Sequence, residues 1–319
     1  MRAFELTFEH RWIYVFELVQ NALDAGAQSI AFRLSDDGDT LTFQHDGQNP
    51  IDEEDVKGLS KIFRSTKGAA SVGFMGIGFK SVFGRFREAR VSGWGWRFNY
   101  KMARVVGEEY GDVQTDPLGA VLPLWDDGIA EPEAGFTTRF EFCERVDPAT
   151  NLQSDLTRLL SNADLTLLAV LAASNLERID VDGRVWKLSA GDKVVDGSMT
   201  ATARSDAEER RWQLFPVEFE PSRAATRRFL EYRKIQPAEE ESEQVYAAAA
   251  RPRRVLGMLP LDDRGLPAPP QRGLIYATLP TEVTLPLGIH VNADWLLNIS
   301  RSAAAAAPHS TMIQNNPTW

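Results

Sequence analysis

Apolar residues recur at helical spacing near the start of the chain. Between residues 8 and 25 they share one broad face, made by Trp12, Val15, Phe16, Val19 and Leu23. This period predicts an amphipathic helix, and Gly26 follows it where helices commonly end. The period then changes to alternation over 29–34 and 40–45, on either side of a turn rich in aspartate. The alternation predicts a β-hairpin.

The pattern predicts further elements to the end of the chain. The first part is predicted to contain a helix over 52–63 with Asp52 as its N-cap, and a hairpin over 89–100. Strands over 120–125 and 137–142 and helices over 149–162 and 164–174 are predicted to follow. The second part is predicted to contain strands over 193–203, 212–219, 274–279 and 288–291, and a basic helix over 222–234. Residues 251–254 and 266–270 are predicted to be linkers or loop tips. We expect an α+β fold with an antiparallel or mixed sheet on one side and helices on the other. Residues 1–190 would form the first domain, and residues 191–319 a smaller α/β region.

Composition narrows the class of protein. The chain has 319 residues, of which 43% are hydrophobic, enough for a large core and for two domains. Its formal net charge of −10 disfavours a broad nucleic-acid surface, so nucleic acid is not an expected partner. The single cysteine, Cys143, excludes intramolecular disulfides and a cysteine zinc cluster, as expected in a reducing compartment. No apolar stretch has the length of a signal peptide or membrane span, so we expect a soluble, cytoplasmic protein.

A glycine-rich segment, Gly73 to Gly78, precedes a run of apolar residues. Its three glycines permit positive φ angles and leave room for a ligand against the backbone. The residues that follow have the spacing of one helical face, which predicts a helix directly after the loop: Phe79, Val82, Phe83 and Phe86. Such a loop aims N–H groups and the positive end of a helix dipole at an anion, and it suits a polyphosphate. The G-x-x-x-x-G-K-[ST] pattern of a Walker loop is absent, and the preceding residues do not predict the strand of a dinucleotide site.

The first predicted helix carries a candidate catalytic pair. Glu17 and Asn21 are four residues apart, so they project from one side of the helix, and Asp24 lies one turn further on. An amide oxygen such as that of Asn21 suits a hard cation that keeps several waters. A carboxylate one turn earlier suits the orientation of an attacking water. The alternative is that both side chains are solvated, which is the usual case for an isolated pair of this kind.

Three of these segments stand in one order and together resemble the GHKL ATPases, the family of gyrase B, the ninety-kilodalton heat-shock chaperone, MutL and the histidine-kinase ATP domains. Residues Glu17 to Ala25 resemble the first motif, and His45 to Pro50 stand in the place of the second, D-x-G-x-G. Residues Gly73 to Phe83 are similar to the third motif of the chaperone branch. The resemblance covers residues 12–142. It implies a two-layer Bergerat-type sandwich that binds ATP and Mg²⁺, of the heat-shock-chaperone or sacsin-like branch.

The resemblance also implies roles for the matching residues. Asn21 would be the Mg²⁺ ligand, Glu17 would orient water, and Asp24 would line the nucleotide site. Backbone amides would bind the phosphates, from Gly73, Gly76, Ile77, Gly78 and Phe79.

The lid and the residue after the loop are less closely defined. Ser65, Thr66 and Lys67 fit the lid, where Lys67 either contacts phosphate or is solvated. Lys80 departs from the chaperone branch, which tends to an aromatic residue there, and it faces either phosphate or solvent.

Recognition of adenine requires an acceptor for the exocyclic amine, and here the sequence departs from the family. Alignment on Gly47 places His45 at the usual aspartate position and Asp46 one residue later. A slip of one residue in the turn would aim Asp46 at the base, and His45 could equally be a capped turn residue. Thr138 or Thr137 stands in the place of a family threonine that contacts the adenine region. The sequence leaves both choices open.

The second region contains one further fragment of a motif. Leu297 to Arg301 is similar to the N-[LV]-S-R segment of the chaperone's middle domain, which implies that Arg301 reaches the γ-phosphate. The glutamine that usually follows one turn later is replaced by Ala305. Residues 278–292 also resemble sacsin-like proteins, in which an ATP domain heads a much larger chain. The chain ends at Trp319 without a recognisable stop, as a fragment would.

These features are compatible with two functions. One is a slow ATPase switch that acts on a protein client or effector, with a homodimer as one arrangement. The other is a nucleotide-sensing module that binds ATP without meaningful turnover, for example in a prokaryotic defence or DNA-processing assembly. A histidine-kinase domain is disfavoured, because no phosphoacceptor helix precedes the ATP domain and those domains do not normally need the water-orienting glutamate. Glu17 therefore distinguishes the classes.

Overall fold

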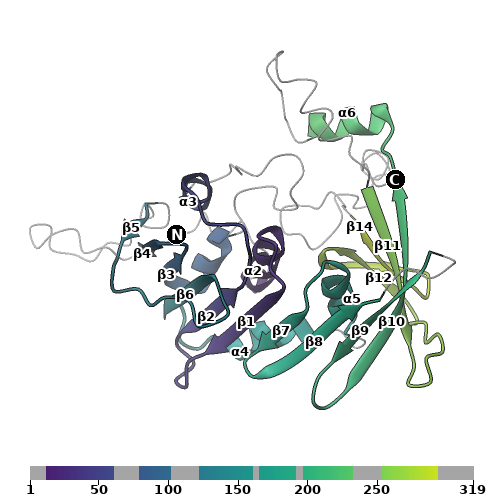
Figure 1. The fold of residues 1–319 in the computed structure, drawn as a ribbon, viewed down its shortest axis with the longest axis horizontal. Coiled ribbons are helices and arrows are strands. Elements are labelled where there is room, and N and C mark those ends of the chain that lie inside the picture. The colour runs from purple at the N-terminus through teal and green to yellow at the C-terminus, as the bar shows by residue number, and fades with distance from the viewer. Residues whose placement is uncertain are drawn as a thin grey trace, which may run out of the picture. The chain divides into compact units, whose positions relative to one another are not determined.

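The computed structural model describes residues 12–60, 79–101, 122–160, 165–191, 197–232 and 253–293 (Figure 1). The chain divides into two compact units. Unit 1 comprises residues 1–67, 73–161 and 176–187, and unit 2 comprises residues 68–72, 162–175 and 188–319. Both units combine strands with a few helices, so the fold is α+β.

The first predicted helix is present in unit 1 as α2 (Ile13–Asp24), the first element within the described ranges. Its C-terminus is closed by two backbone hydrogen bonds, from Gly26 N–H to Leu23 O and from Ala27 N–H to Ala22 O, both at 3.0 Å. Gly26 has a φ of +73°, the left-handed conformation in which glycine carries no Cβ penalty. The predicted end of the helix is therefore confirmed.

The predicted hairpin is also confirmed, as β1 (Ser29–Leu34) paired antiparallel with β2 (Leu41–His45). The short helix α3 (Glu53–Ser60) follows. Asp52 is its N-cap, as expected, because its Oδ1 accepts the N–H of Asp55 at 2.8 Å.

The segment after the glycine-rich loop corrects a prediction. It forms a six-residue 3-10 helix, η1 (Phe79–Gly84), and Phe86 already belongs to the strand β3 (Phe86–Gly93). The helix ends early because Phe86 pairs with Arg145 of β6 and packs edge-on against Tyr14 of α2, at 5.9 Å between ring centroids. β3 and β4 (Trp96–Lys101) form the second predicted hairpin.

The rest of unit 1 completes its sheet and adds two short helical segments. They are β5 (Leu124–Trp125), β6 (Thr138–Arg145), α4 (Leu152–Thr157), η4 (Arg158–Leu160), β7 (Arg178–Val181) and β8 (Arg184–Ala190), of which β8 ends in unit 2. The strand order is β8-β7-β1-β2-β6-β3-β4-β5. In this sheet β1 and β7 are parallel and the other pairs are antiparallel, so the sheet of unit 1 is mixed.

In the described part of unit 2, the helix α5 (Thr166–Ala173) is buried and packs against β9, β10, β11 and β13. Its other elements are β9 (Met199–Arg204), β10 (Glu209–Phe219), α6 (Arg223–Tyr232), β11 (Arg253–Leu261), β12 (Gly273–Ala277), β13 (Leu279–Leu285) and β14 (His290–Ala293). The strand order is β13-β12-β14-β11-β10-β9. Arg253 and Arg254 begin β11, so the prediction of a linker or loop tip at 251–254 is wrong for these two residues. They pair with Phe219 and Glu218 of β10, and this long-range pairing has no signal in the local sequence.

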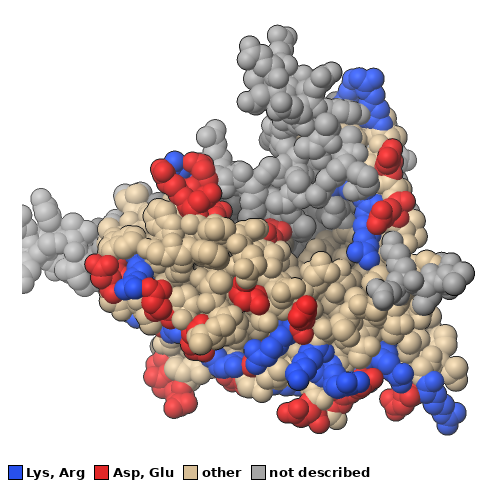
Figure 2. Space-filling view, viewed as in Figure 1, with Lys and Arg blue, Asp and Glu red and all other residues tan. Residues whose placement is uncertain are grey.

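The described surface mixes both signs of charge. On the face drawn in Figure 2, acidic and basic side chains are interspersed, without one broad basic area. The predicted basic helix is confirmed as α6, and its Arg223 and Arg227 are exposed. Within the described ranges, no helix is both long and apolar enough to cross a membrane.

Candidate functional site

The candidate site lies in unit 1, where β2 ends and β6 begins. His45, the last residue of β2, stands directly opposite Thr138, the first residue of β6. Both side chains are buried, with 4% of His45 and 1% of Thr138 exposed. The His45 ring continues a row of aromatic side chains, with its centroid 6.0 Å from that of Phe43 and 6.2 Å from that of Phe140. Phe140 in turn lies 5.9 Å from Phe79, the first residue of η1.

The protonation state of His45 follows from its contacts. The backbone N–H of Gly47 donates to Nδ1 at 3.1 Å, so Nδ1 acts as an acceptor and the hydrogen of the neutral ring is on Nε2. Burial lowers the pKa of His45 to about 4, although the nearby charge of Asp46 acts in the opposite direction. At neutral pH the ring is therefore uncharged and presents an N–H donor.

Thr137 and Thr138 have different surroundings, although the sequence did not distinguish them. The Thr137 hydroxyl donates to Gly47 O at 2.7 Å, and its backbone N–H donates to His45 O at 3.0 Å. Thr137 thus holds the turn after β2 in place. The Oγ1 atom of Thr138 is buried and has no hydrogen-bond partner in the described part of the chain. Of the two residues, Thr138 is the one with an available hydroxyl.

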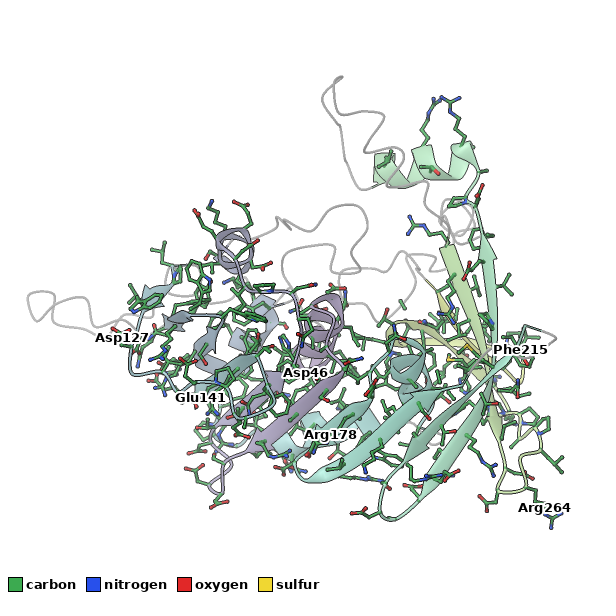
Figure 3. All side chains as sticks on the ribbon, in the orientation of Figure 1. Asp46, Asp127, Glu141, Arg178, Phe215 and Arg264 are labelled. Carbon is green, nitrogen blue, oxygen red and sulfur yellow. The ribbon has the colours of Figure 1, made fainter. Side chains whose placement is uncertain are left out.

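Asp46 is engaged with the backbone of β1. Its Oδ1 accepts the N–H groups of Gln28 at 2.8 Å and Ser29 at 2.7 Å, and the residue follows directly after β2 (Figure 3). These bonds satisfy two donors at the start of β1 and fix the direction of the carboxylate. A contact between Asp46 and a base stays a prediction.

The end of α2 is held against the turn after β2. Asn49 donates its backbone N–H to Ala25 O at 3.2 Å and its Nδ2 to Asp24 O at 3.3 Å. A Cβ on Gly47 would lie 2.8 Å from both Ala25 Cβ and His45 Nδ1, so only glycine fits there without displacement. The contact between the end of α2 and the turn after β2 was not predicted. Gly47 was the only sign of it in the sequence. It brings the first and second sequence motifs together.

The candidate catalytic residues lie along α2. Glu17 is 4% exposed, and Asn21 and Asp24 are half-buried. No three His, Cys, Asp or Glu side chains within the described ranges are grouped as they would be at a resident metal site. A single amide oxygen such as that of Asn21 suits Mg²⁺ that arrives with a polyphosphate and keeps several waters. Asn21 therefore fits a Mg²⁺ ion that enters together with a polyphosphate.

Lys80 is buried beneath aromatic rings rather than exposed. It is 1% exposed, and its Nζ lies 4.2 Å from the ring centroid of Tyr100 and 5.3 Å from that of Phe79. Burial lowers its pKa to about 7. The interpretation that Lys80 faces solvent is wrong, because packing of η1 on the sheet covers this side chain.

Six of the predicted site residues lie outside the described ranges: Lys67, Gly73, Gly76, Ile77, Gly78 and Arg301. Their roles stay predictions. Phe79, at the edge of this gap, is 5% exposed, and its ring packs against the aromatic row.

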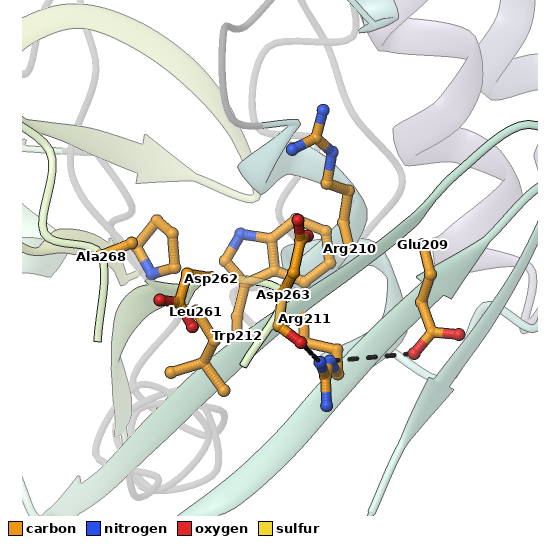
Figure 4. Close-up of a pocket in the computed structure, with 9 residues that line it drawn as sticks. Glu209, Arg210, Arg211, Trp212, Leu261, Asp262, Asp263 and Ala268 are labelled. Carbon is orange, nitrogen blue, oxygen red and sulfur yellow. Dashed lines mark hydrogen bonds and ion pairs between the residues drawn. The ribbon is translucent and has the colours of Figure 1, made fainter. Parts of the chain in front are cut away.

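Unit 2 contains a separate cavity of about 570 Å³ next to the loop after β11 (Figure 4). Its charged groups serve the local fold. Arg211 donates to Asp263 O at 2.9 Å, and Asp262 Oδ1 accepts the N–H groups of Arg264 and Leu266. Trp212 lines the cavity with a buried Nε1 that has no partner in the described part of the chain. None of the predicted site residues lines this cavity.

Comparisons with known proteins find similarity among solved structures. No protein-family model matches the chain. No curated protein matches it. Among solved structures, it is similar to the B subunit of DNA gyrase from Myxococcus xanthus, with a TM-score of 0.35 and 12% identity, over 65% of this chain and 62% of that chain. The chain thus spans less than two thirds of this neighbour. A TM-score at this level supports no conclusion about site or activity.

Proposed function

We propose that unit 1 binds ATP with Mg²⁺ and hydrolyses it slowly, as a conformational switch of the heat-shock-chaperone or sacsin-like type. One observation carries the proposal: three segments that are distant in the sequence meet at one place. The end of α2 lies against Gly47, and His45 is joined through Phe140 to the first residue of η1. These segments contain the first motif, the second motif and the end of the third.

In this proposal the backbone of residues 73–79 binds the phosphates and Asn21 supplies an oxygen to Mg²⁺. A glycine-rich loop suits the first role because its amide groups can approach an anion closely. Asn21 suits the second role because it is only half-buried and carries an amide oxygen. Asp24, on the same helix, would line the same site.

Glu17 would orient the attacking water. The oxygen of this water forms a bond to the γ-phosphorus, and the bond to the β,γ-bridging oxygen breaks with its electron pair leaving on ADP. The water proton passes to Glu17 and from there to the phosphate. Arg301 of the second region would stabilise charge on the γ-phosphate. The domains proposed for these roles are residues 1–190 and 191–319.

The second candidate is a sensor that binds ATP without turnover. The burial of Glu17, of which 4% is exposed, favours this candidate, because a buried carboxylate meets fewer water molecules. The two candidates differ in hydrolysis and agree on binding. A protein client or effector, and a homodimer, are compatible with both.

Binding isotherms and single-turnover hydrolysis on the same protein test the proposal. We expect Mg²⁺-dependent ATP binding in the micromolar to millimolar range, and Asn21→Ala should abolish its Mg²⁺ dependence. Glu17→Ala should keep binding and slow hydrolysis by roughly a hundredfold or more. Wild-type turnover that is unaffected by Glu17→Ala would contradict the assigned mechanism. Absence of turnover with intact binding would favour the sensor, and absence of nucleotide binding would exclude both candidates.

A further inference from the structure

The cavity of unit 2 has a buried floor and a charged rim (Figure 4). Trp212 and Pro260 form the floor: they are direct partners in the β10–β11 pairing, and both are buried. The rim comes from the start of β10 and the loop after β11, and its exposed charged residues are Glu209, Arg210, Asp262 and Asp263. The volume of about 570 Å³ is within the range of small-molecule sites. None of the residues proposed to bind ATP lines this cavity, so it is a separate candidate site.

The floor carries a hydrogen-bond donor that the described part of the chain leaves unused. Trp212 is 1% exposed, and its Nε1 has no partner there. An indole N–H can only donate, and a buried one normally finds an acceptor, so this group requires an acceptor on a ligand. Arg210 lies two residues before Trp212, on the same side of β10, and is exposed. Rotation of such an exposed side chain is fast and gives a ligand access to the floor.

The rim offers carboxylate oxygens beyond those that hold the loop. Asp263 contacts Arg211 through its backbone carbonyl, and no contact within the described ranges uses its carboxylate. Asp262 uses Oδ1 for two backbone N–H groups of the loop, which leaves Oδ2 available within the same ranges. Both carboxylates can therefore accept hydrogen bonds from a ligand.

The two arginines of the lining already face acidic side chains. Arg210 pairs with Glu208 at 2.7 Å, and Arg211 Nε lies 3.8 Å from Glu209 Oε1 while its Nη2 donates to the loop. The charge that remains available at the rim is therefore negative, and it favours a cationic group on the ligand.

The ligand must combine a cation for the rim, an acceptor for Trp212 and an apolar part for the remaining wall, which is made by Pro260, Leu261 and Ala268. An amino acid residue with a free amino group carries all three: its α-ammonium, its carbonyl oxygen and its side chain. We propose that this cavity binds the α-ammonium and carbonyl groups of an apolar amino-terminal residue. The ammonium donates to the carboxylates of Asp262 and Asp263, and the carbonyl oxygen accepts from Trp212 Nε1. A free amino acid and the amino terminus of a peptide both present this chemistry.

Titration of isotope-labelled protein with leucinamide tests the proposal, read by nuclear magnetic resonance at the indole N–H signals of the eight tryptophans. Leucinamide has the ammonium, the carbonyl and an apolar side chain, and its amino group is protonated at about pH 6.5. The Trp212 signal, identified by its loss in Trp212→Phe, should shift with a Kd of about 1 mM, as suits a ligand of this size. Acetyl-leucinamide lacks the charge and should bind at least about tenfold more weakly.

Two variants with matched controls test the named contacts, with affinities read from the backbone amide signal of Leu261. Asp263→Asn removes a rim charge and should weaken leucinamide by about tenfold. Asp206→Asn is its control, because Asp206 is also exposed and does not line the cavity. Trp212→Phe keeps an aromatic floor without the N–H and should weaken leucinamide by about fivefold. Trp186→Phe is its control, because Trp186 is buried with an Nε1 that also has no partner within the described ranges, but it lies in unit 1.

Leucine and leucyl-glycinamide distinguish the two sources of the ligand, and whichever binds more tightly identifies the source. A Trp212 signal that stays unchanged at a large excess of leucinamide would overturn the proposal, as would equal affinities for leucinamide and acetyl-leucinamide. Equal binding by Asp263→Asn and Asp206→Asn would also overturn it, and this exposed substitution stays informative if Trp212→Phe does not fold. ATP binding is measured independently, so a failure here leaves the function proposed for unit 1 unaffected.

Discussion

Arg85 and Asp155 form a buried, doubly hydrogen-bonded ion pair that joins the residue before β3 to α4. Arg85 Nε donates to Asp155 Oδ2 at 2.8 Å, and Nη2 donates to Oδ1 at 2.9 Å. The exposed fractions of their side chains are 14% and 5%. A planar guanidinium matches a carboxylate in this geometry, and removal of one partner leaves the other charge buried.

Asp155→Ala should therefore lower the free energy of unfolding by about 3–5 kcal/mol. Urea denaturation monitored by circular dichroism measures this change. The double variant Arg85→Met with Asp155→Leu removes both charges and should recover much of the loss. Arg204→Ala is the control, because the Arg204–Glu209 pair is exposed and should contribute about 1 kcal/mol or less. Equal effects of Asp155→Ala and Arg204→Ala would contradict the assignment.

Gly47→Ala should disturb the junction between α2 and β2. The added Cβ would lie 2.8 Å from Ala25 Cβ and from His45 Nδ1, and 2.9 Å from Ala25 O. We expect a loss of about 1–3 kcal/mol in the free energy of unfolding, together with weaker nucleotide binding. Gly84→Ala is the matched control, because a Cβ there meets no atom within 4 Å. Thermal unfolding and binding isotherms on both variants test the prediction, which a neutral Gly47→Ala would refute.

His45 should make stability depend on pH in the acidic range. Its pKa is about 4 in the folded state and 6.5 for the free side chain, so the unfolded chain binds the proton first as pH falls. The contribution of His45 to the free energy of unfolding is therefore fully present above pH 6.5. It is lost as pH falls towards 4, by about 3 kcal/mol in total. Denaturation at a series of pH values, compared between wild type and His45→Gln, isolates this contribution. The same pH slope in both proteins would show that His45 is not its source.

Lys80 should also make the free energy of unfolding rise with pH, in this case in the basic range. Its pKa is lowered by burial to about 7, against 10.5 for the free side chain, so the unfolded chain holds the proton more strongly between these values. Wild-type stability should therefore rise with pH from about 7 to 10.5. Lys80→Met has a similar length and no charge, so this increase should be absent from the variant. Denaturation curves at pH 7, 8.5 and 10 make the comparison, and an unchanged increase in Lys80→Met would contradict the prediction.

Local sequence determined several elements of this protein. The apolar face from Trp12 to Leu23 and the following Gly26 predicted α2 and its end, because helical periodicity and a left-handed glycine are local properties. Alternation predicted the β1–β2 and β3–β4 hairpins for the same reason. The order of Glu17, Asn21 and Gly47 along the chain also indicated which segments to expect in one site.

Tertiary structure alone decided the remaining features. Phe86 follows a helical pattern in sequence, yet it joins β3 because strand pairing with Arg145 and packing on Tyr14 outweigh the weak local preference of a short segment. The pairing of β11 with β10 likewise depends on residues far apart in the chain. The neutral ring of His45, the available hydroxyl of Thr138 and the burial of Lys80 follow from the atoms that surround them. Protonation and hydrogen-bond satisfaction depend on those surroundings, which come together only when the chain is folded.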